Sequence, residues 1–148
     1  MSDCIFCKII AGQIPCTKVY EDDACLAFLD IGPISPGHTL IVPKKHYEAI
    51  SQMPADELAA LYRPVAALAA AVQAAVGSEG LNVLQNNGRS AGQAVEHLHI
   101  HLIPRWTGDG LGFRWPAKKA DMAVLAKQAE AIKKCLPARC SRGEGGSA

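Results

Sequence analysis

The stretch His97-Leu98-His99-Ile100-His101-Leu102-Ile103 decides the fold, because imidazole and aliphatic side chains alternate along it. Successive side chains of a β-strand point to opposite faces, so a strand here places all three histidines on one face. A helix would spread the histidines around its axis. We therefore predict a strand over residues 97–103 that ends at Pro104, because proline cannot continue a paired ladder.

Three imidazoles on one face indicate a functional site rather than simple packing. Histidine titrates near neutral pH and serves as a base, a nucleophile or a metal ligand. The pattern leaves two kinds of enzyme open. In one, a histidine attacks the substrate; in the other, the cluster holds a catalytic metal. Replacing His99 would release the metal only in the second kind.

Outward from this stretch, the hydrophobic pattern predicts a single α+β domain over residues 1–136. Further strands of an antiparallel sheet are expected over residues 19–21, 25–29, 39–42 and 81–85. Helices are expected over residues 4–11, 54–76 and 121–136. The long central helix contains Pro64, which predicts a kink there. The Gly- and Ser-containing tail, residues 137–148, is predicted to be disordered.

The composition argues against several classes of function. A formal net charge of +1 indicates no basic surface for nucleic acid. The N-terminus lacks a basic region followed by a long apolar run, so no secretory signal is expected. The most apolar segment, residues 58–76, is interrupted by Arg63, Pro64 and Gln73 and is not expected to span a membrane. Six cysteines without a secretory signal favour a cytoplasmic protein with reduced thiols.

Five further motifs accompany the histidine run. They are Cys4-Ile5-Phe6-Cys7, Phe28-Leu29-Asp30-Ile31, Pro36-Gly37-His38-Thr39-Leu40, Pro43-Lys44-Lys45-His46 and Gln85-Asn86-Asn87-Gly88. In this order, and with the alternating histidines, they resemble the histidine triad (HIT) superfamily of nucleotide hydrolases and transferases. The resemblance extends over roughly residues 4–116. It implies a HIT-like half-barrel sheet with a long central helix and a short N-terminal helix, a homodimer, and a purine nucleotide substrate.

The same resemblance assigns roles to individual residues. His99 would be the nucleophile, with His101 and Gln93 beside it at the phosphate or the leaving group. Asp30 would bind the ribose hydroxyls, because an ionised carboxylate accepts two hydrogen bonds from a diol. The other implied substrate contacts are His38 and Asn86 at the phosphate, and Phe6, Ile9, Phe28 and Ile31 around the base. Without the resemblance, most of these apolar residues would be assigned to the core.

Cys4 and Cys7 form a C-x-x-C pair, which is a weak signal without a second pair of the same spacing. A bacterial-type branch of the superfamily holds structural zinc with two such cysteines and two histidines. Matching of motifs places the ligands here at Cys4, Cys7, His46 and His97, a closed tetrahedral set. A reduced, metal-free thiol pair is the alternative. If His97 binds zinc, it is not an acid-base catalyst.

The resulting hypothesis is a HIT-family hydrolase or transferase acting at the α-phosphate of purine nucleoside phosphoramidates or dinucleoside polyphosphates. A covalent nucleotidyl-histidine would form and then be cleaved by water, with no metal in the chemical step. Most relatives have Ser or Thr where this chain has Ala94. A nucleotide-binding protein with little turnover therefore stays open. The segment Gly108–Trp115 would close over the leaving group or cross a dimer interface, and the sequence does not choose.

Overall fold

The computed structural model describes residues 3–112 and 119–137. Contacts within the chain divide it into two units, residues 1–110 and 111–148. The predicted single domain over residues 1–136 therefore stays a prediction. The predicted disordered tail lies outside the described residues from 138 onwards, and so do residues 113–115 of the Gly108–Trp115 segment.

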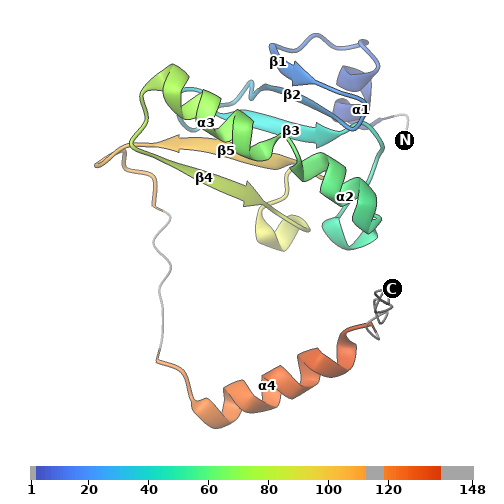
Figure 1. The fold of residues 1–148 in the computed structure, drawn as a ribbon, viewed down its shortest axis with the longest axis vertical. Coiled ribbons are helices and arrows are strands. Elements are labelled where there is room, and N and C mark those ends of the chain that lie inside the picture. Colours follow the sequence, from blue (N-terminus) through green and yellow to red (C-terminus); the bar gives the residue numbers. More distant parts are fainter. Residues whose placement is uncertain (1–2, 113–118, 138–148) are drawn as a thin grey trace, which may run out of the picture. The chain divides into compact units, whose positions relative to one another are not determined.

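The first unit is built on one open, five-stranded antiparallel sheet with the strand order β1-β2-β3-β5-β4 (Figure 1). Its strands are β1 (Lys18–Glu21), β2 (Cys25–Leu29), β3 (Thr39–Pro43), β4 (Gly80–Gln85) and β5 (Ile100–Arg105). The central strands β2 and β3 are apolar on both faces and almost wholly buried, because other elements cover both sides of the sheet. The predicted α+β class and antiparallel sheet are confirmed.

The histidine run joins the sheet later than predicted. β5 begins at Ile100, which pairs with Ile41 of β3. Before that point the N–H of Leu98 donates to the carbonyl of Tyr47, at 2.6 Å, in the segment that follows β3. The prediction of a strand from residue 97 is therefore wrong for its first three residues, because a loop carbonyl replaces the ladder partner there. Its predicted end at Pro104 is also wrong, because Pro104 pairs with Leu81 of β4 and β5 continues to Arg105.

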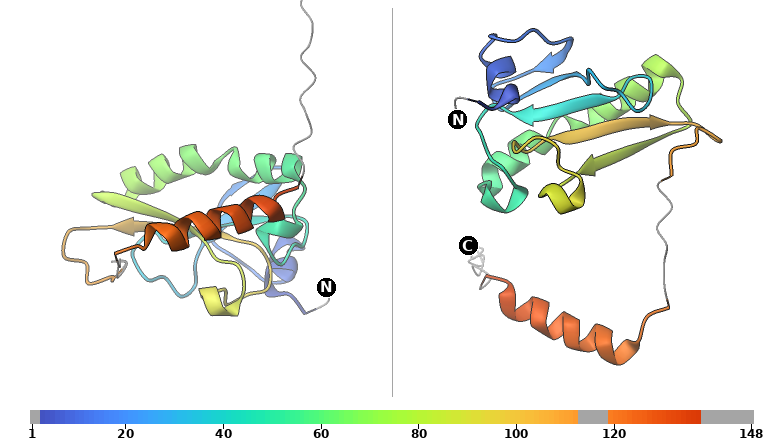
Figure 2. Two further views of the ribbon diagram at one scale, coloured as in Figure 1. Left: turned by 90° about the horizontal axis from the view of Figure 1, so that it is seen from below. Right: turned by 180° about the vertical axis from the view of Figure 1, so that it is seen from behind.

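The central helix is divided in two, α2 (Ala55–Tyr62) and α3 (Val65–Val76). The break lies at Arg63-Pro64, because proline has no N–H to donate to the preceding turn. The predicted kink is thus confirmed. Together the two helices run across one face of the sheet (Figures 1 and 2). α3 ends at Gly77, whose left-handed φ of 64° closes the helix.

The sheet separates two hydrophobic clusters, and strand alternation decides which side chain enters which. One cluster joins α2 and α3 to the sheet through Leu61, Val65, Leu68, Val72, Ile41, Leu98, Ile100 and Leu102. The other joins α1 (Ile5–Ile10) to the sheet through Phe6, Leu26, Phe28, Leu40 and Val42. Each fully buried side chain of this size contributes roughly 1.5–3 kcal/mol. Leu98, Ile100 and Leu102 of the histidine run thus lie in the first cluster, which leaves the three imidazoles on the other face.

Residues 55–76 are long and apolar enough to cross a membrane by length and composition alone. Their inward side chains, Leu61, Val65, Leu68 and Val72, instead form the core of the first unit. A bent helix packed on a sheet is the arrangement of a core helix.

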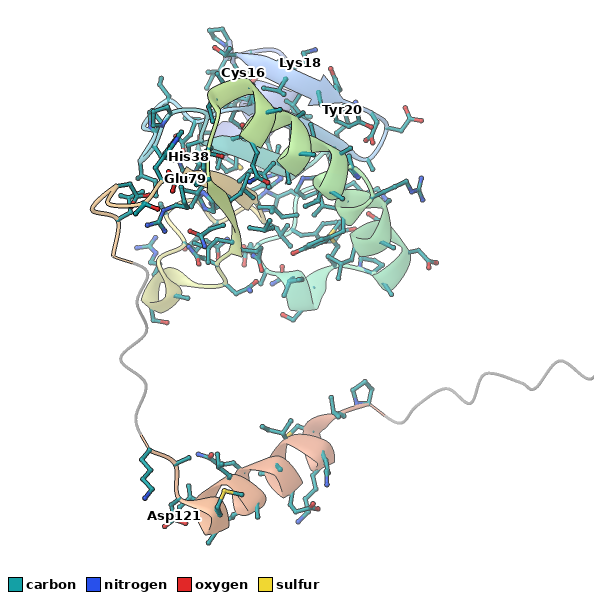
Figure 3. All side chains as sticks on the ribbon, turned by 60° about the vertical axis from the view of Figure 1, so that its left-hand side comes forward. Cys16, Lys18, Tyr20, His38, Glu79 and Asp121 are labelled. Carbon is teal, nitrogen blue, oxygen red and sulfur yellow. The ribbon has the colours of Figure 1, made fainter. Side chains whose placement is uncertain are left out.

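Two short 3₁₀ turns and the helix α4 complete the described chain. Two 3₁₀ turns, Ile50–Gln52 and Arg89–Ala91, lie in the loops before α2 and after β4. In the second unit, α4 (Met122–Cys135) begins at Asp121 (Figure 3), whose carboxylate accepts the N–H groups of Ala123 and Val124. The predicted helix over residues 121–136 is confirmed.

Gly37→Ala is expected to lower the free energy of unfolding more than Gly12→Ala. Both glycines have positive φ, 80° and 71°, so alanine at either costs roughly 1–2 kcal/mol. Only at Gly37 would the new methyl group meet a neighbour, Cγ1 of Val76 at 2.8 Å. That overlap adds roughly 1–3 kcal/mol. Urea titration of both variants measures the difference, and equal losses would show that Val76 yields without cost.

Candidate active site

Each histidine of the run faces a different set of partners. His97 points toward two cysteines, His99 toward a main-chain carbonyl, and His101 toward His38. Among residues 3–112 and 119–137, the groups of side chains that could hold a metal are Cys4, Cys7, His46 and His97, and Asp30, His38 and His101. Neither group gathers the three histidines around one point. The geometry therefore does not support a catalytic metal held by the run.

The first group brings together all four residues predicted as zinc ligands. Sγ of Cys4 lies 3.4 Å and Sγ of Cys7 lies 3.6 Å from Nδ1 of His97. Nδ1 of His46 lies 3.4 Å from Sγ of Cys7. All four donor atoms are within 4.8 Å of one another. The cysteines lie at the start of α1, whereas His46 is 39 positions after Cys7 and His97 is 93 positions after Cys4.

The donor set fits a zinc ion chemically. Nε2–H of His97 donates to the carbonyl of Pro43 at 2.9 Å, which leaves the lone pair on Nδ1 directed at the sulfur atoms. A metal-ligating imidazole needs such a bond to fix its tautomer. Burial lowers the pKa of His97 to about 4, so the ring is neutral near neutral pH. Two cysteine thiolates and two imidazoles would form a closed set of four ligands that suits structural zinc.

His99 is buried, and its tautomer is set by the main chain. Its Nδ1–H donates to the carbonyl of His97 at 2.6 Å. Because Nδ1 carries the proton, Nε2 holds a free lone pair. The ring of Phe6 packs edge-on, with ring centroids 5.2 Å apart, and also packs edge-on against His97. Phe6 thus ties α1 to both histidines.

His101 pairs with His38, the residue directly before β3. Its Nδ1 lies 2.9 Å from Nε2 of His38, and Nδ1 of His38 lies 3.6 Å from a carboxylate oxygen of Asp30. Burial lowers the pKa of His38, and burial with His99 nearby lowers the pKa of His101 to about 4. Both rings are therefore neutral near neutral pH. Figure 3 labels His38 in the first unit, where it is the last residue before β3.

The side chain of Gln93 lies in the loop before the histidine run, and its role at the phosphate or the leaving group stays a prediction. Its side chain is buried and braces the loop before the histidine run: Oε1 accepts the N–H of Gly88 at 2.6 Å, and Nε2 donates to the carbonyl of Glu48 at 2.7 Å. These are the contacts of a positioning residue, because the amide is engaged with the main chain. Asn86, also predicted at the phosphate, is half-buried at the start of the same loop, with its amide nitrogen near Gly92.

The four apolar residues predicted around the base divide into two kinds. Phe6 and Phe28 are buried and pack edge-on at 5.8 Å, so they belong to the core beneath the site. Ile9 is half-buried, and Ile31, beside Asp30, is fully exposed. The base-binding roles stay predictions. Only Ile9 and Ile31 present substantial surface for a ligand.

Main-chain groups supply several contacts that the sequence could not indicate. The carbonyls of Pro43, Tyr47, Glu48 and His97 hold His97, Leu98, Gln93 and His99, respectively. A carbonyl carries no residue-specific signal, because every residue has one. Only Pro43 and His97 lie inside motifs that the sequence analysis had singled out.

Comparison with known proteins agrees with this geometry. A family model described as the HIT domain matches residues 11–108. The chain belongs to the HIT family. Among HIT relatives, the adenosine 5'-monophosphoramidase of Schizosaccharomyces pombe is 49% identical over 115 residues, which cover 77% of this chain and 84% of the relative. The prediction that the chain is a HIT-family hydrolase is therefore confirmed.

Solved HIT structures share the fold. A member of the HIT family from Bacillus subtilis has a TM-score of 0.87 at 42% identity, covering 92% of this chain and 99% of that chain. A Zn-bound histidine triad family protein from Mycobacterium smegmatis has a TM-score of 0.66 at 34% identity, covering 88% and 98%. The HIT-like fold is therefore confirmed.

Acidification is expected to destabilise the wild type more than His101→Gln. The folded pKa of His101 is about 4, against an ordinary value of 6.5. Between these values the unfolded chain binds a proton that the folded chain does not, so the free energy of unfolding falls as the pH falls through this window. Glutamine does not titrate. Urea titrations across the window compare the two proteins, and parallel curves would contradict the lowered pKa.

Proposed function

We propose that this HIT protein hydrolyses purine nucleoside phosphoramidates, with dinucleoside polyphosphates as a second substrate class, through a nucleotidyl intermediate on His99. The observation that carries the proposal is the 2.6 Å bond from Nδ1–H of His99 to the carbonyl of His97. That bond leaves Nε2 unprotonated in a buried site, as a nucleophile requires. The phosphoramidase named among the relatives supports the substrate class.

The reaction proceeds in two displacements at the α-phosphorus. In the first, the Nε2 lone pair of His99 forms a bond to phosphorus while the bond from phosphorus to the leaving nitrogen breaks. That nitrogen takes a proton from water and departs as an amine. In the second, a water-derived oxygen bonds to phosphorus as the bond to Nε2 breaks, which returns the electron pair to His99. The net change is one water added across the phosphorus–nitrogen bond, and one hard step becomes two easier ones.

The substrate is proposed to lie across the open end of the histidine face. Asp30 accepts hydrogen bonds from the ribose hydroxyls, and Ile9 and Ile31 contact the base. His101 and Asn86 donate to the phosphate oxygens, where neutral donors stabilise developing charge. Gln93 acts by holding the loop that carries these groups.

Zinc is proposed as a structural ion on Cys4, Cys7, His46 and His97. When bound, it supplies cross-linking rather than chemistry, because all four positions of its coordination shell belong to the protein. Its ligands would fasten α1 to the start of the histidine run. The proposed homodimer rests on the family resemblance, and the proposed cytoplasmic location rests on the six cysteines without an expected secretory signal. Sedimentation and cell fractionation test them.

His99→Asn is expected to lose hydrolysis of adenosine 5'-phosphoramidate by about 10³-fold or more while keeping its zinc. The loss follows because removing the nucleophile closes the covalent route. Zinc is retained because His99 is not among the proposed ligands. The assay measures ammonia or AMP release together with zinc content in both proteins.

A matched variant, Cys7→Ser, should show the opposite pattern, with zinc lost from the purified protein. If His99→Asn instead lost zinc together with activity, the metallohydrolase would replace the present proposal. If wild type failed to cleave either substrate class yet bound nucleotide, the chain would be a binding protein.

Ala94→Ser is expected to raise kcat/KM for the phosphoramidate. Ala94 is exposed in the loop directly after Gln93, where a hydroxyl would reach the phosphate of the bound substrate. A hydrogen bond to a charged group contributes roughly 1.5–3 kcal/mol, which corresponds to a rise of about tenfold to a hundredfold. Ala91→Ser, on the same loop, is the control for an added hydroxyl. Equal rates in the two variants would show that the missing hydroxyl does not limit turnover.

A further inference from the structure

His38 occupies a position that its predicted substrate contact does not explain. Its side chain is 4% exposed, and both ring nitrogens already face protein groups. Nε2 lies 2.9 Å from Nδ1 of His101, and Nδ1 receives the N–H of Ile34 at 3.4 Å. A buried ring with both nitrogens engaged has no free edge for a ligand.

The partners of His38 fix the proton positions along this path. The N–H of Ile34 donates to Nδ1 at 3.4 Å, whereas the Asp30 carboxylate lies 3.6 Å from the same nitrogen, beyond hydrogen-bond distance. We therefore assign the proton of neutral His38 to Nε2. Nε2–H then donates to Nδ1 of His101, so the proton of His101 must sit on its own Nε2. Among the described residues no hydrogen bond engages that Nε2–H. It is therefore available as a donor at the half-exposed edge of the ring.

Asp30 joins the same path from the other side. One carboxylate oxygen accepts the N–H of Gly32 at 2.8 Å, and the other lies 3.6 Å from Nδ1 of His38. The main-chain N–H of Asp30 also donates to the carbonyl of His38 at 2.9 Å. Asp30 and His38 are thus held together twice, and the carboxylate is still 20% exposed. A ligand on Asp30 would act on the electrostatic environment of His38.

We infer that Asp30 and His38 are positioning residues, which hold His101 as an Nε2–H donor and so link the ribose site to the phosphate site. The inference rests on the proposed function for the identity of those two sites. No proton needs to move along the path. Its effect is to fix which hydrogen bond His101 offers to the phosphate, and in which direction.

The alternative use of Asp30, His38 and His101 is a second cation site. The distance of 2.9 Å between Nε2 of His38 and Nδ1 of His101 is that of a hydrogen bond. A proton between the two nitrogens occupies the lone pairs that a metal would need. The geometry therefore favours the positioning role.

Two amide substitutions at position 38 distinguish the effect of the Nε2–H donor from the effect of losing the imidazole ring. The amide nitrogen of His38→Gln reaches the place of Nε2 and can still donate to His101. The amide of His38→Asn reaches only the place of Nδ1, so it keeps the contact with Ile34 and withdraws the donor. Both variants are polar and smaller than histidine, so differences between them report the donor.

The first measurement is made on the free protein and requires no turnover. Long-range ¹H–¹⁵N NMR of the imidazoles should show His101 protonated on Nε2 in wild type and in His38→Gln. In His38→Asn the proton should distribute between both nitrogens. An unchanged His101 tautomer in His38→Asn would overturn the inference. So would loss of a zinc equivalent from either variant relative to wild type.

The second measurement uses adenosine 5'-phosphoramidate. His38→Asn should lower kcat by about tenfold to a hundredfold with KM within about twofold, because a misdirected donor affects the transition state. His38→Gln should recover most of kcat. Equal rises in KM with unchanged kcat in both variants would instead make His38 a substrate ligand. If wild type shows no turnover, the proposed function fails, whereas the NMR result still decides the tautomer.

A substrate analogue tests the link through Asp30. Removing the ribose 2'- and 3'-hydroxyls should lower kcat as well as raise KM in wild type. The decrease in kcat should be smaller in His38→Asn, where the path is already broken. Effects that multiply independently would overturn the link, because uncoupled sites are additive in free energy.

Discussion

Alternation of side chains along residues 97–103, an extended segment that becomes β5 at Ile100, is the constraint on which the molecule depends. A β-strand gives its two faces to alternate side chains, so one short segment supplies both a hydrophobic core and a chemical site. Leu98, Ile100 and Leu102 anchor the segment against α2 and α3. The burial of these aliphatic side chains therefore holds the histidines on the opposite face, where the imidazoles are kept for the chemistry of the site. A shift of one residue would exchange the two sets completely.

The second face acquires its order from the main chain. His97, His99 and Leu98 are each held by a carbonyl group, and these carbonyls come from the histidine run itself and from the segment around Pro43 and Tyr47. Neutral imidazoles have two tautomers, and only a fixed partner selects one. The site is thus a set of three differently assigned rings rather than three equivalent ones. That division explains why the run does not form a common metal centre.

The sequence was sufficient for the fold because its signals were local and periodic. Alternation predicted β5, proline predicted the break between α2 and α3, and Asp121 marked the start of α4. The start of β5 was misplaced because hydrogen bonding to Tyr47 depends on a loop that periodicity does not describe. The roles of Gln93 and His38 were beyond the sequence for a related reason. Both side chains are polar, and only distances show that they form hydrogen bonds within the protein.

The packing of α1 beside the histidine run has a consequence for how the chain acquires its site. Cys4 and His97 are separated by 93 positions, yet their side chains touch. Contacts of such long range close late, because the intervening chain must first be confined. During synthesis, the contact between Cys4 and His97 therefore cannot form until most of the sheet has been synthesised. A nascent chain interrupted before the histidine run leaves both cysteines without His97 and Phe6 without His97 and His99, so an incomplete product exposes more of these three side chains than the finished protein does.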